Sequence, residues 1–419
     1  MAYESFIASR LRLSGKGGGT ATSIIMAIAG IALAMVIMMS ALCIVTGFKH
    51  EIRRKVTGFD AHVSILAESE ATTGEFQESK RSPVLTFSPE LHAIIDSTGL
   101  FRASELVVEH PAVIKTDSDF EGIILRGLTP GPGTAFITES ICEGSWPGNP
   151  DDDNSIVISK STAGKLKIGL NDRIFTYFFT DEGVRTRRLT VSAIYDTHFS
   201  DYDKVYAFSP ISLLQGVNVF DSLQGNRIDL YLHDTDDIDG AALRLQEAMM
   251  HEAWAGRLDG LYRISSVTST GMMYFNWLEL LDTNVIVILV LMTLVSGFTL
   301  VSSLFIIILE RIRMIGILKS LGASNASVTR IFSLLGRRLV VYGMLIGNAV
   351  GLLLMFLQQH FHLMPLDPEA YYLDFVPVEI NAWQILCLNA GVFVIAWCVL
   401  LIPGRLISSV SPAKSMRYE

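Results

Sequence analysis

The sequence has few cysteines, and their spacing excludes most cysteine chemistry. Only four occur in 419 residues, and Cys43, Cys387 and Cys398 lie in apolar runs. Cys142 stands alone in the large polar segment, so no disulfide can form within that segment, and no C-x-x-C pair exists to bind a metal. We interpret the cysteines as packing residues.

The sequence has no excess of basic over acidic residues. The formal net charge of −9 at pH 7 argues against a nucleic-acid partner, since such partners are bound by basic surfaces. Half of the residues are hydrophobic, which is typical of a chain that lies partly in a membrane. The length predicts two or three domains.

Motifs for nucleotide hydrolysis, metal binding and nucleophilic catalysis are missing too. Gly15–Thr20 does not fit G-x-x-x-x-G-K-[ST], and Asp151–Asn154 does not have the spacing of a calcium loop. His360 and His362 are too few to hold zinc, and no serine lies in a G-x-S-x-G elbow. We predict a non-catalytic chain that binds no metal or cofactor, so that any ATP hydrolysis would come from a separate subunit.

Four apolar runs are present, and each is long enough to cross a hydrocarbon core of about 30 Å. We predict membrane spans at 22–46, 283–309, 339–357 and 385–402. The first run is too long for a signal peptide. Its small residues, such as Ala27 and Gly30, either admit a neighbouring helix or are simple alanine filling.

The spans contain no carboxylate or basic side chains, since Asp282 and Glu310 only flank them. This disfavours a proton-coupled carrier, which needs such groups near mid-membrane. Asn284, Asn348 and Asn389 are predicted to form hydrogen bonds between helices.

Lys and Arg in the short connections predict the orientation. Segment 1–21 has three, 310–338 has six, 403–419 has three, and 358–384 has none. By the positive-inside rule, the first three are cytoplasmic, and 358–384 lies outside with the large segment 47–282.

Segment 47–282 mixes strand and helix signals. Helices are predicted at 89–98, with Ser88 as N-cap, at 160–167 and at 238–251. The predicted strands are 61–66, 107–115, 122–128, 155–159, 173–180, 184–195, 204–208, 227–233 and 262–267. We predict an α/β lobe formed by 47–134 and 226–282, with a β-rich lobe, 135–225, inserted in it.

Glu310–Ser324 follows the second span directly. Ile312, Ile315 and Leu318 recur at helical spacing, and basic residues lie off that stripe. The pattern predicts a short amphipathic helix at the cytoplasmic surface, either a passive interfacial helix or a lever moved by a partner.

Several motifs together resemble the LolC/LolE group of lipoprotein-releasing permeases, within the MacB/FtsX-like superfamily. They are FIASRLRLSGK, GFKHEIRRKVTGFDAHVSI, LERIRMIGILKSLGAS and the closing SPAKSMRYE. The resemblance covers nearly the whole chain. It implies an α-helical membrane protein with four transmembrane helices and a large α+β periplasmic domain, a porter-like α/β lobe with an inserted β-rich lobe, between helices 1 and 2.

The resemblance also implies partners. These are LolD-type ATPase subunits, which bind ATP and Mg, a second permease chain in a homodimer or heterodimer, and a LolA-type periplasmic carrier. The ligands are acylated lipoproteins taken from the outer leaflet of the inner membrane of a Gram-negative bacterium. MacB-like export of other substrates and an FtsX-like signalling scaffold are the alternatives.

Three sets of site residues follow from the resemblance. The ATPase-coupling set is Glu310, Arg311, Arg313, Ile315, Gly316, Ile317, Leu318, Leu321, Gly322 and Ala323. The ligand-contacting set is Met35, Met38, Met39, Leu42, Val285, Ile288, Leu289 and Met292. The carrier-docking set is Tyr177, Asp181, Arg185 and Arg187, in a hairpin that is shorter than the protruding loop of LolC-type members.

Overall fold

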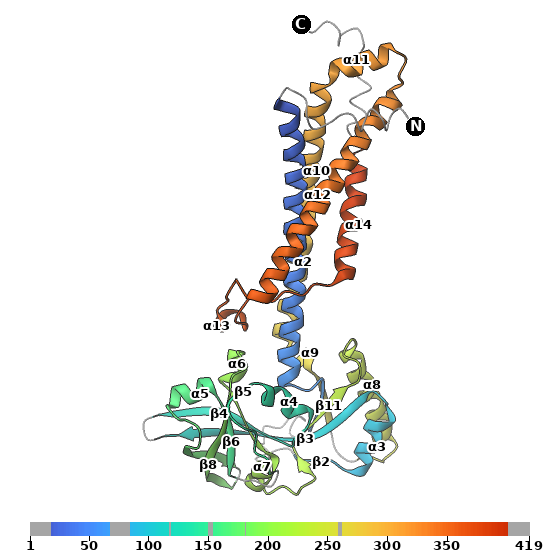
Figure 1. Cartoon of the computed structure of the whole chain (residues 1–419). Coiled ribbons are helices and arrows are strands. Elements are labelled where there is room, and N and C mark those ends of the chain that lie inside the picture. Colours follow the sequence, from blue (N-terminus) through green and yellow to red (C-terminus); the bar gives the residue numbers. More distant parts are fainter. Residues whose placement is uncertain are drawn as a thin grey trace, which may run out of the picture. The chain divides into compact units, whose positions relative to one another are not determined.

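The computed structural model describes residues 18–67, 84–116, 119–149, 154–180, 182–258 and 262–400 (Figure 1). Within it the chain divides into two compact units. A helical unit is formed by Met1–Lys49, Leu278–Pro365 and Phe375–Glu419, and an α/β unit by His50–Trp277 and Leu366–Asp374. The cytoplasmic tail predicted at 403–419 lies outside the described residues, as does most of the predicted segment 1–21.

Four helices among the described residues are long and apolar enough to cross a membrane. They are α2 (Gly18–Phe59), α10 (Met272–Glu310), α12 (Asn325–Phe361) and α14 (Ala382–Val399). Helix α12 begins well before the predicted span at 339. Its first turns carry Val328, Phe332 and Leu335 at helical spacing, and burial of these side chains extends the helix.

Helix α12 packs against α2 through glycines spaced four residues apart. A Cβ atom at Gly343 would lie 2.8 Å from Ile31, and one at Gly347 would lie 2.7 Å from the Cβ of Met35. Glycine alone allows the two backbones to approach this closely. This Gly-x-x-x-Gly spacing was not part of the prediction. In the first span, a Cβ atom at Gly30 would lie 2.7 Å from Thr299, so of the two interpretations of its small residues this position supports close approach of a neighbouring helix.

A pair of amides joins α12 to α14. Asn348 Nδ2 donates to Asn389 Oδ1 at 2.6 Å, and Asn389 Nδ2 donates back to Asn348 Oδ1 at 3.1 Å. The predicted interhelical hydrogen bond of these two residues is confirmed. Polar side chains buried among apolar helices are stabilised by such reciprocal bonds.

The α/β unit contains the predicted strands and helices, with ends shifted by a few residues. Ser88 caps its helix as predicted, accepting from the Leu91 N–H at 3.2 Å.

The strands are β1 (Val63–Ala67), β2 (Leu85–Thr86), β3 (Phe101–Lys115), β4 (Phe120–Leu128), β5 (Ile141–Gly144), β6 (Ser155–Ser159), β7 (Arg173–Thr180), β8 (Gly183–Tyr195), β9 (Tyr206–Pro210), β10 (Gln224–Gly225), β11 (Arg227–Leu232) and β12 (Tyr262–Ser266). The short helices are α3 (Pro89–Ser97), α4 (Pro132–Glu139), α5 (Lys160–Leu166), α6 (Ser200–Asp203), α7 (Ile211–Asn218), α8 (Ile238–Trp254), α9 (Val267–Thr270) and α13 (Pro368–Tyr371). Helices α4, α6, α7 and α13 and the short strands β2, β5 and β10 were not predicted.

Strand β3 belongs to both lobes. Its first half continues the antiparallel order β12-β1-β11-β3, against which α8 packs. Its second half pairs with β4 on one side and β7 on the other, and β4, β9, β6, β8 and β7 complete a closed ring. The barrel therefore includes residues 107–128, which the prediction assigned to the α/β lobe. Pairing between strands distant in sequence sets this boundary.

The end of α2 is held by buried charges. The Arg126 guanidinium on β4 donates to the carbonyl of Phe59, the last residue of α2, to Asp60 Oδ1 at 2.9 Å and to Glu109 Oε1 at 2.6 Å. Tyr202 donates to the other Asp60 oxygen at 2.8 Å. Arg126 and Asp60 are 1% and 4% exposed, so each charge depends on its partner. The two arginines 126 and 227 lower the pKa of Asp60 against the opposing effect of burial.

We predict that Arg126→Met destabilises the α/β unit by about 3–5 kcal/mol, because the buried Asp60 and the half-buried Glu109 would lose one of their two cations and keep only Arg227. Urea unfolding of the full chain in detergent, followed by tryptophan fluorescence, measures the loss. Arg188→Met is the control, since Arg188 is exposed on β8. Equal stability of the two variants would contradict the prediction.

A second buried acid makes stability depend on pH. Burial, together with the nearby Asp229 charge, raises the pKa of Glu105 to about 7, although the Gly133 N–H donates to its carboxylate. The folded protein thus binds a proton that the unfolded chain releases at its ordinary pKa of 4.5. The contribution to stability is complete below pH 4.5 and is lost as the pH rises through about 7.

We predict that Glu105→Gln is more stable than the parent chain at pH 8, by on the order of 3 kcal/mol, because no charge is then buried. The difference should shrink towards pH 5. Thermal unfolding of both proteins at the two pH values tests this. A pH-independent difference would show that Glu105 does not titrate in this range.

Candidate functional sites

The short helix that follows α10 ends in a sharp turn. Helix α11 spans Ile312–Ser320, and two residues past its end lies Gly322, whose φ of 92° favours glycine. The Ala323 N–H donates to the Leu318 carbonyl at 2.9 Å, and the Gly322 N–H to the Lys319 carbonyl at 3.1 Å. Ser324 then caps α12 by accepting from the Ser327 N–H at 3.2 Å. These paired caps hold α11 at an abrupt bend between two long helices.

One face of α11 packs within the helical unit. Ile315 is fully buried in a cluster with Ile24, Val328 and Phe332. Gly316 is also buried, and Arg311, Ile312, Leu318, Lys319 and Ala323 are half-buried. Most of the apolar stripe seen in the sequence is therefore used inside the chain.

The opposite face of α11 is exposed. It carries Arg313, Ile317 and, just past the helix end, Leu321, spaced four residues apart, and the two apolar side chains are 55% and 79% exposed. Glu310 and Gly322 are exposed as well. Leu321 does not join the buried stripe, because the helix ends before it. Of the predicted coupling set, Arg313, Ile317 and Leu321 thus form the surface available to a partner.

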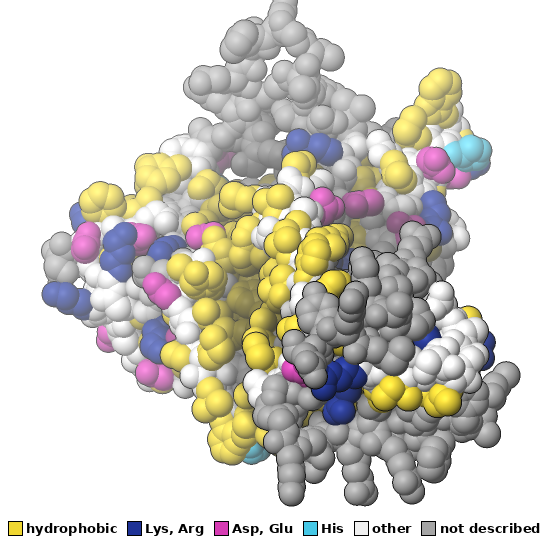
Figure 2. Space-filling view, turned by 90° about the horizontal axis from the view of Figure 1, so that it is seen from above, with side chains coloured by type: hydrophobic (Ala, Val, Ile, Leu, Met, Phe, Trp, Pro, Cys, Tyr) yellow, Lys and Arg dark blue, Asp and Glu magenta, His cyan; other side chains and the backbone are white. Residues whose placement is uncertain are grey.

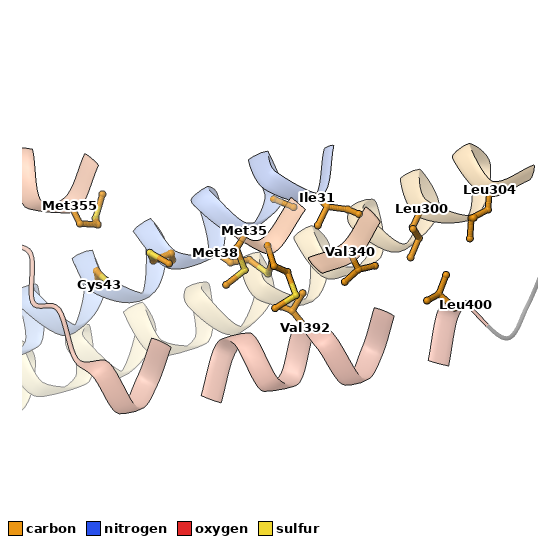
Figure 3. Close-up of a cluster of buried hydrophobic side chains, with 13 residues drawn as sticks. Ile31, Met35, Met38, Cys43, Leu300, Leu304, Val340, Met355, Val392 and Leu400 are labelled. Carbon is orange, nitrogen blue, oxygen red and sulfur yellow. The ribbon is translucent and has the colours of Figure 1, made fainter. Parts of the chain in front are cut away.

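The predicted ligand residues of α2 lie inside the helical unit. Met35, Met38 and Met39 are fully buried in a cluster with side chains of α10, α12 and α14. Figure 3 shows Met35 and Met38 among the side chains of this cluster, which include Val340 and Val392. Leu42 is half-buried. Contact between a ligand and these methionines would require the four helices to separate.

Helix α10 presents a different surface. Of its predicted residues, Val285 is buried and Ile288, Leu289 and Met292 are half-buried. The exposed stripe is Val287, Leu291, Leu294 and Phe298. Beside it, Thr293, Ser296 and Gly297 line a shallow hollow closed by Val392 and Val399 of α14. Figure 2 shows hydrophobic side chains gathered in the middle of the view, with charged ones scattered around them.

The predicted docking hairpin is formed by β7 and β8, which pair as far as Thr180 and Gly183. Tyr177 is half-buried and Arg187 is exposed. Arg185 forms an ion pair with Glu182 and donates to the Val217 carbonyl at 2.7 Å, so it is engaged within the chain. Asp181 lies outside the described residues. The hairpin also exposes Phe175, Phe179 and Val184, which the prediction did not include.

The described part of the chain contains no group of three or more His, Cys, Asp or Glu residues placed to hold a metal ion. The surfaces described above expose large apolar side chains. Exposed apolar surfaces commonly mark sites that bind other proteins or lipid.

Two family models match the chain. Residues 24–248 match the MacB-like periplasmic core domain, and residues 286–412 match the FtsX-like permease C-terminal domain. Among solved structures, the periplasmic region of MacB from Actinobacillus actinomycetemcomitans is 13% identical, with a TM-score of 0.33, and the match covers 54% of this chain and 98% of that one.

Curated relatives match over nearly the full length. The lipoprotein-releasing system transmembrane protein LolC of Neisseria meningitidis is 24% identical over 100% of both chains. LolC of Xylella fastidiosa (strain 9a5c) is 23% identical over 94% of this chain and 93% of that one. LolE of Haemophilus influenzae is 22% identical over 92% of both. The chain therefore belongs to the FtsX-like permeases with a MacB-like periplasmic core domain, as a multi-pass membrane protein distantly related to LolC and LolE.

Proposed function

We propose that the chain is the permease subunit of an ATP-driven complex that releases acylated lipoproteins from the inner membrane of a Gram-negative bacterium. The observation that carries the proposal is the agreement with LolC and LolE over 92–100% of this chain, outer domain and membrane helices together. The complex would lift its ligand from the outer leaflet and pass it to a LolA-type carrier in the periplasm.

A LolD-type ATPase would bind the exposed face of α11. This is supported by Ile317 and Leu321, two large apolar side chains left in contact with water, and by the neighbouring Arg313. The sequence has no phosphate-binding loop, so ATP and Mg would be bound by that partner. A second permease chain, identical or not, would complete the complex.

We predict that Ile317→Asp and Leu321→Asp each weaken ATPase binding by roughly 10- to 100-fold, because buried apolar residues at the centre of an interface dominate its affinity. Co-purification and titration with the ATPase measure the effect. Ala326→Asp is the matched control, since it places the same charge at an exposed position in the first turn of α12, where the helix dipole favours it.

Ile315→Asp should instead lower the amount of folded protein, because Ile315 is fully buried. Normal ATPase binding by both Ile317→Asp and Leu321→Asp would exclude this face of α11 as the coupling surface.

The acyl chains of the ligand would lie along the exposed stripe of α10 and in the adjoining hollow. This placement is supported by the lining of the hollow, which is apolar except for the hydroxyls of Thr293 and Ser296. An apolar lining suits a hydrocarbon chain. The half-exposed Leu42 and Ile288 could contribute from the predicted set. Met35, Met38 and Met39 would then support the wall from behind.

We predict that a photo-crosslinking amino acid at Leu294 captures acylated lipoprotein, whereas the same probe at Met38 captures other helices of this chain. The reason is exposure, since Leu294 is 52% exposed and Met38 is fully buried. Immunoblotting of ultraviolet-irradiated cells detects both products. Capture of phospholipid alone at Leu294 would contradict ligand binding there.

The carrier would dock on the hairpin of β7 and β8. Its tip exposes Phe179 and Val184, and the following strand carries the exposed Arg187, so an apolar contact with a basic flank is available. This short hairpin would rest against the carrier, since it has no protruding loop to hook it.

Depletion of the protein separates this function from its alternatives. Accumulation of outer-membrane lipoproteins in the inner membrane supports lipoprotein release. Normal lipoprotein sorting with loss of export of another envelope substrate supports a MacB-like exporter. Normal sorting with chains of undivided cells supports an FtsX-like scaffold.

A further inference from the structure

The connection between α12 and α14 belongs to the α/β unit. Its residues Leu366–Asp374 are grouped with His50–Trp277 by their contacts. The Leu366 N–H donates to the Asp374 carbonyl at 2.8 Å and closes the segment at its base. Within it, α13 is followed by Tyr372, whose N–H donates to the Pro368 carbonyl at 3.0 Å. The connection is thus a compact, hydrogen-bonded loop.

Tyr372 packs into an aromatic cluster. Its ring lies 5.2 Å from that of Phe199 and 5.7 Å from that of Tyr274, both nearly edge to face. This is the preferred geometry for aromatic pairs. Phe199, which is fully buried, in turn stacks on Tyr202 at 4.9 Å, and Tyr202 stacks on Phe59 at 4.7 Å.

The two helices α2 and α10 contribute rings to the cluster from the ends that belong to the α/β unit. Phe59 is the last residue of α2, and Tyr274 is in the first turn of α10. Tyr372 adds the connection between α12 and α14 to the same cluster. One group of rings is therefore attached, along the chain, to all four long helices.

Polar contacts reinforce the packing. Lys55 of α2 is only 7% exposed, and its ammonium donates to the carbonyls of Tyr372 at 2.8 Å and His198 at 3.2 Å. His198 Nδ1 lies 3.2 Å from Asp374 Oδ1. Withdrawal of the loop would leave the buried Lys55 cation without one of these two carbonyls, which is unfavourable.

The backbone indicates that the contact is firmly held. Tyr372 and His198 have φ angles of 61° and 53°, a left-handed conformation that side-chain-bearing residues rarely adopt. Such conformations persist where surrounding contacts enforce them. Tyr372 lies in the loop, and His198 lies in the part of the α/β unit that contacts the loop.

We infer that Leu366–Asp374 is a permanent tether, which fixes the connection between α12 and α14 to the site where α2 ends and α10 begins. The outer domain is then linked to the membrane through all four helices. The tether itself is independent of the proposed function, whereas its consequence for lipoprotein release rests on that function.

Crosslinking tests whether the tether is permanent. In a full-length chain with its four cysteines replaced, His198→Cys and Asp374→Cys are bridged by a short thiol-specific crosslinker in membranes that contain the ATPase. We expect equal yields at rest and after trapping with ATP and vanadate, and release by the crosslinked protein within about twofold of the uncrosslinked one. Lower yield in the trapped state, or ATP hydrolysis without release after crosslinking, would overturn the proposal.

Two neighbouring tyrosines provide a matched comparison. Tyr372→Ala removes both edge-to-face contacts, so we expect lower crosslinking and about tenfold slower release. Tyr371→Ala should change neither, because Tyr371 is 45% exposed. Identical behaviour of the two variants in both assays would overturn the tether. If no version releases lipoprotein, the proposed function fails, and the crosslinking yields still decide the tether.

Discussion

The pairing of Arg126 with the end of α2 is the interaction on which the α/β unit depends. A helix of 42 residues ends at Phe59, and its last carbonyls have no partners within the helix. The Arg126 guanidinium donates to the carbonyl of Phe59, and it also forms an ion pair with Asp60. Because both ions are buried, a displaced helix end would leave unpaired charges, so few alternative positions are accessible to it. The end of the first membrane helix is thereby fixed to strand β4.

The membrane imposes a second constraint on the helical unit. Polar groups in hydrocarbon must be satisfied within the protein, and Asn348 and Asn389 satisfy one another. With no hydrophobic driving force between helices in lipid, association depends on close packing. The glycines of α12 allow this close packing, because Ile31 and Met35 of α2 occupy the space that larger side chains would fill. The same packing removes three methionines of α2 from the surface and leaves α10 with an exposed apolar stripe.

Much of this architecture could be predicted from local pattern. The apolar runs, the Ser88 cap and most strands depend on neighbours in the sequence, and the structure has them within a few residues. Hydrogen bonding of Asn348 and Asn389 between helices could be anticipated, because an amide side chain in an apolar span needs a polar partner within the protein. The boundary of the β-rich lobe differs from the predicted one, because β3 and β4 pair with strands that lie about sixty or more residues further along the chain. The exposed side of α11 was also not apparent, since both of its faces carry apolar side chains.

The sequence by itself determined which segments enter the membrane, their orientation and the short amphipathic helix after the second span, since these follow from hydropathy, charge and helical periodicity. Only the tertiary structure decided which apolar residues are available to partners. Met35 and Leu294 are equally apolar in sequence, yet one is fully buried and the other half exposed. The tertiary structure likewise placed Tyr372 beside Phe199, although some 170 residues separate them along the chain. Burial and long-range contact depend on the packing of all neighbours at once, which no single segment specifies.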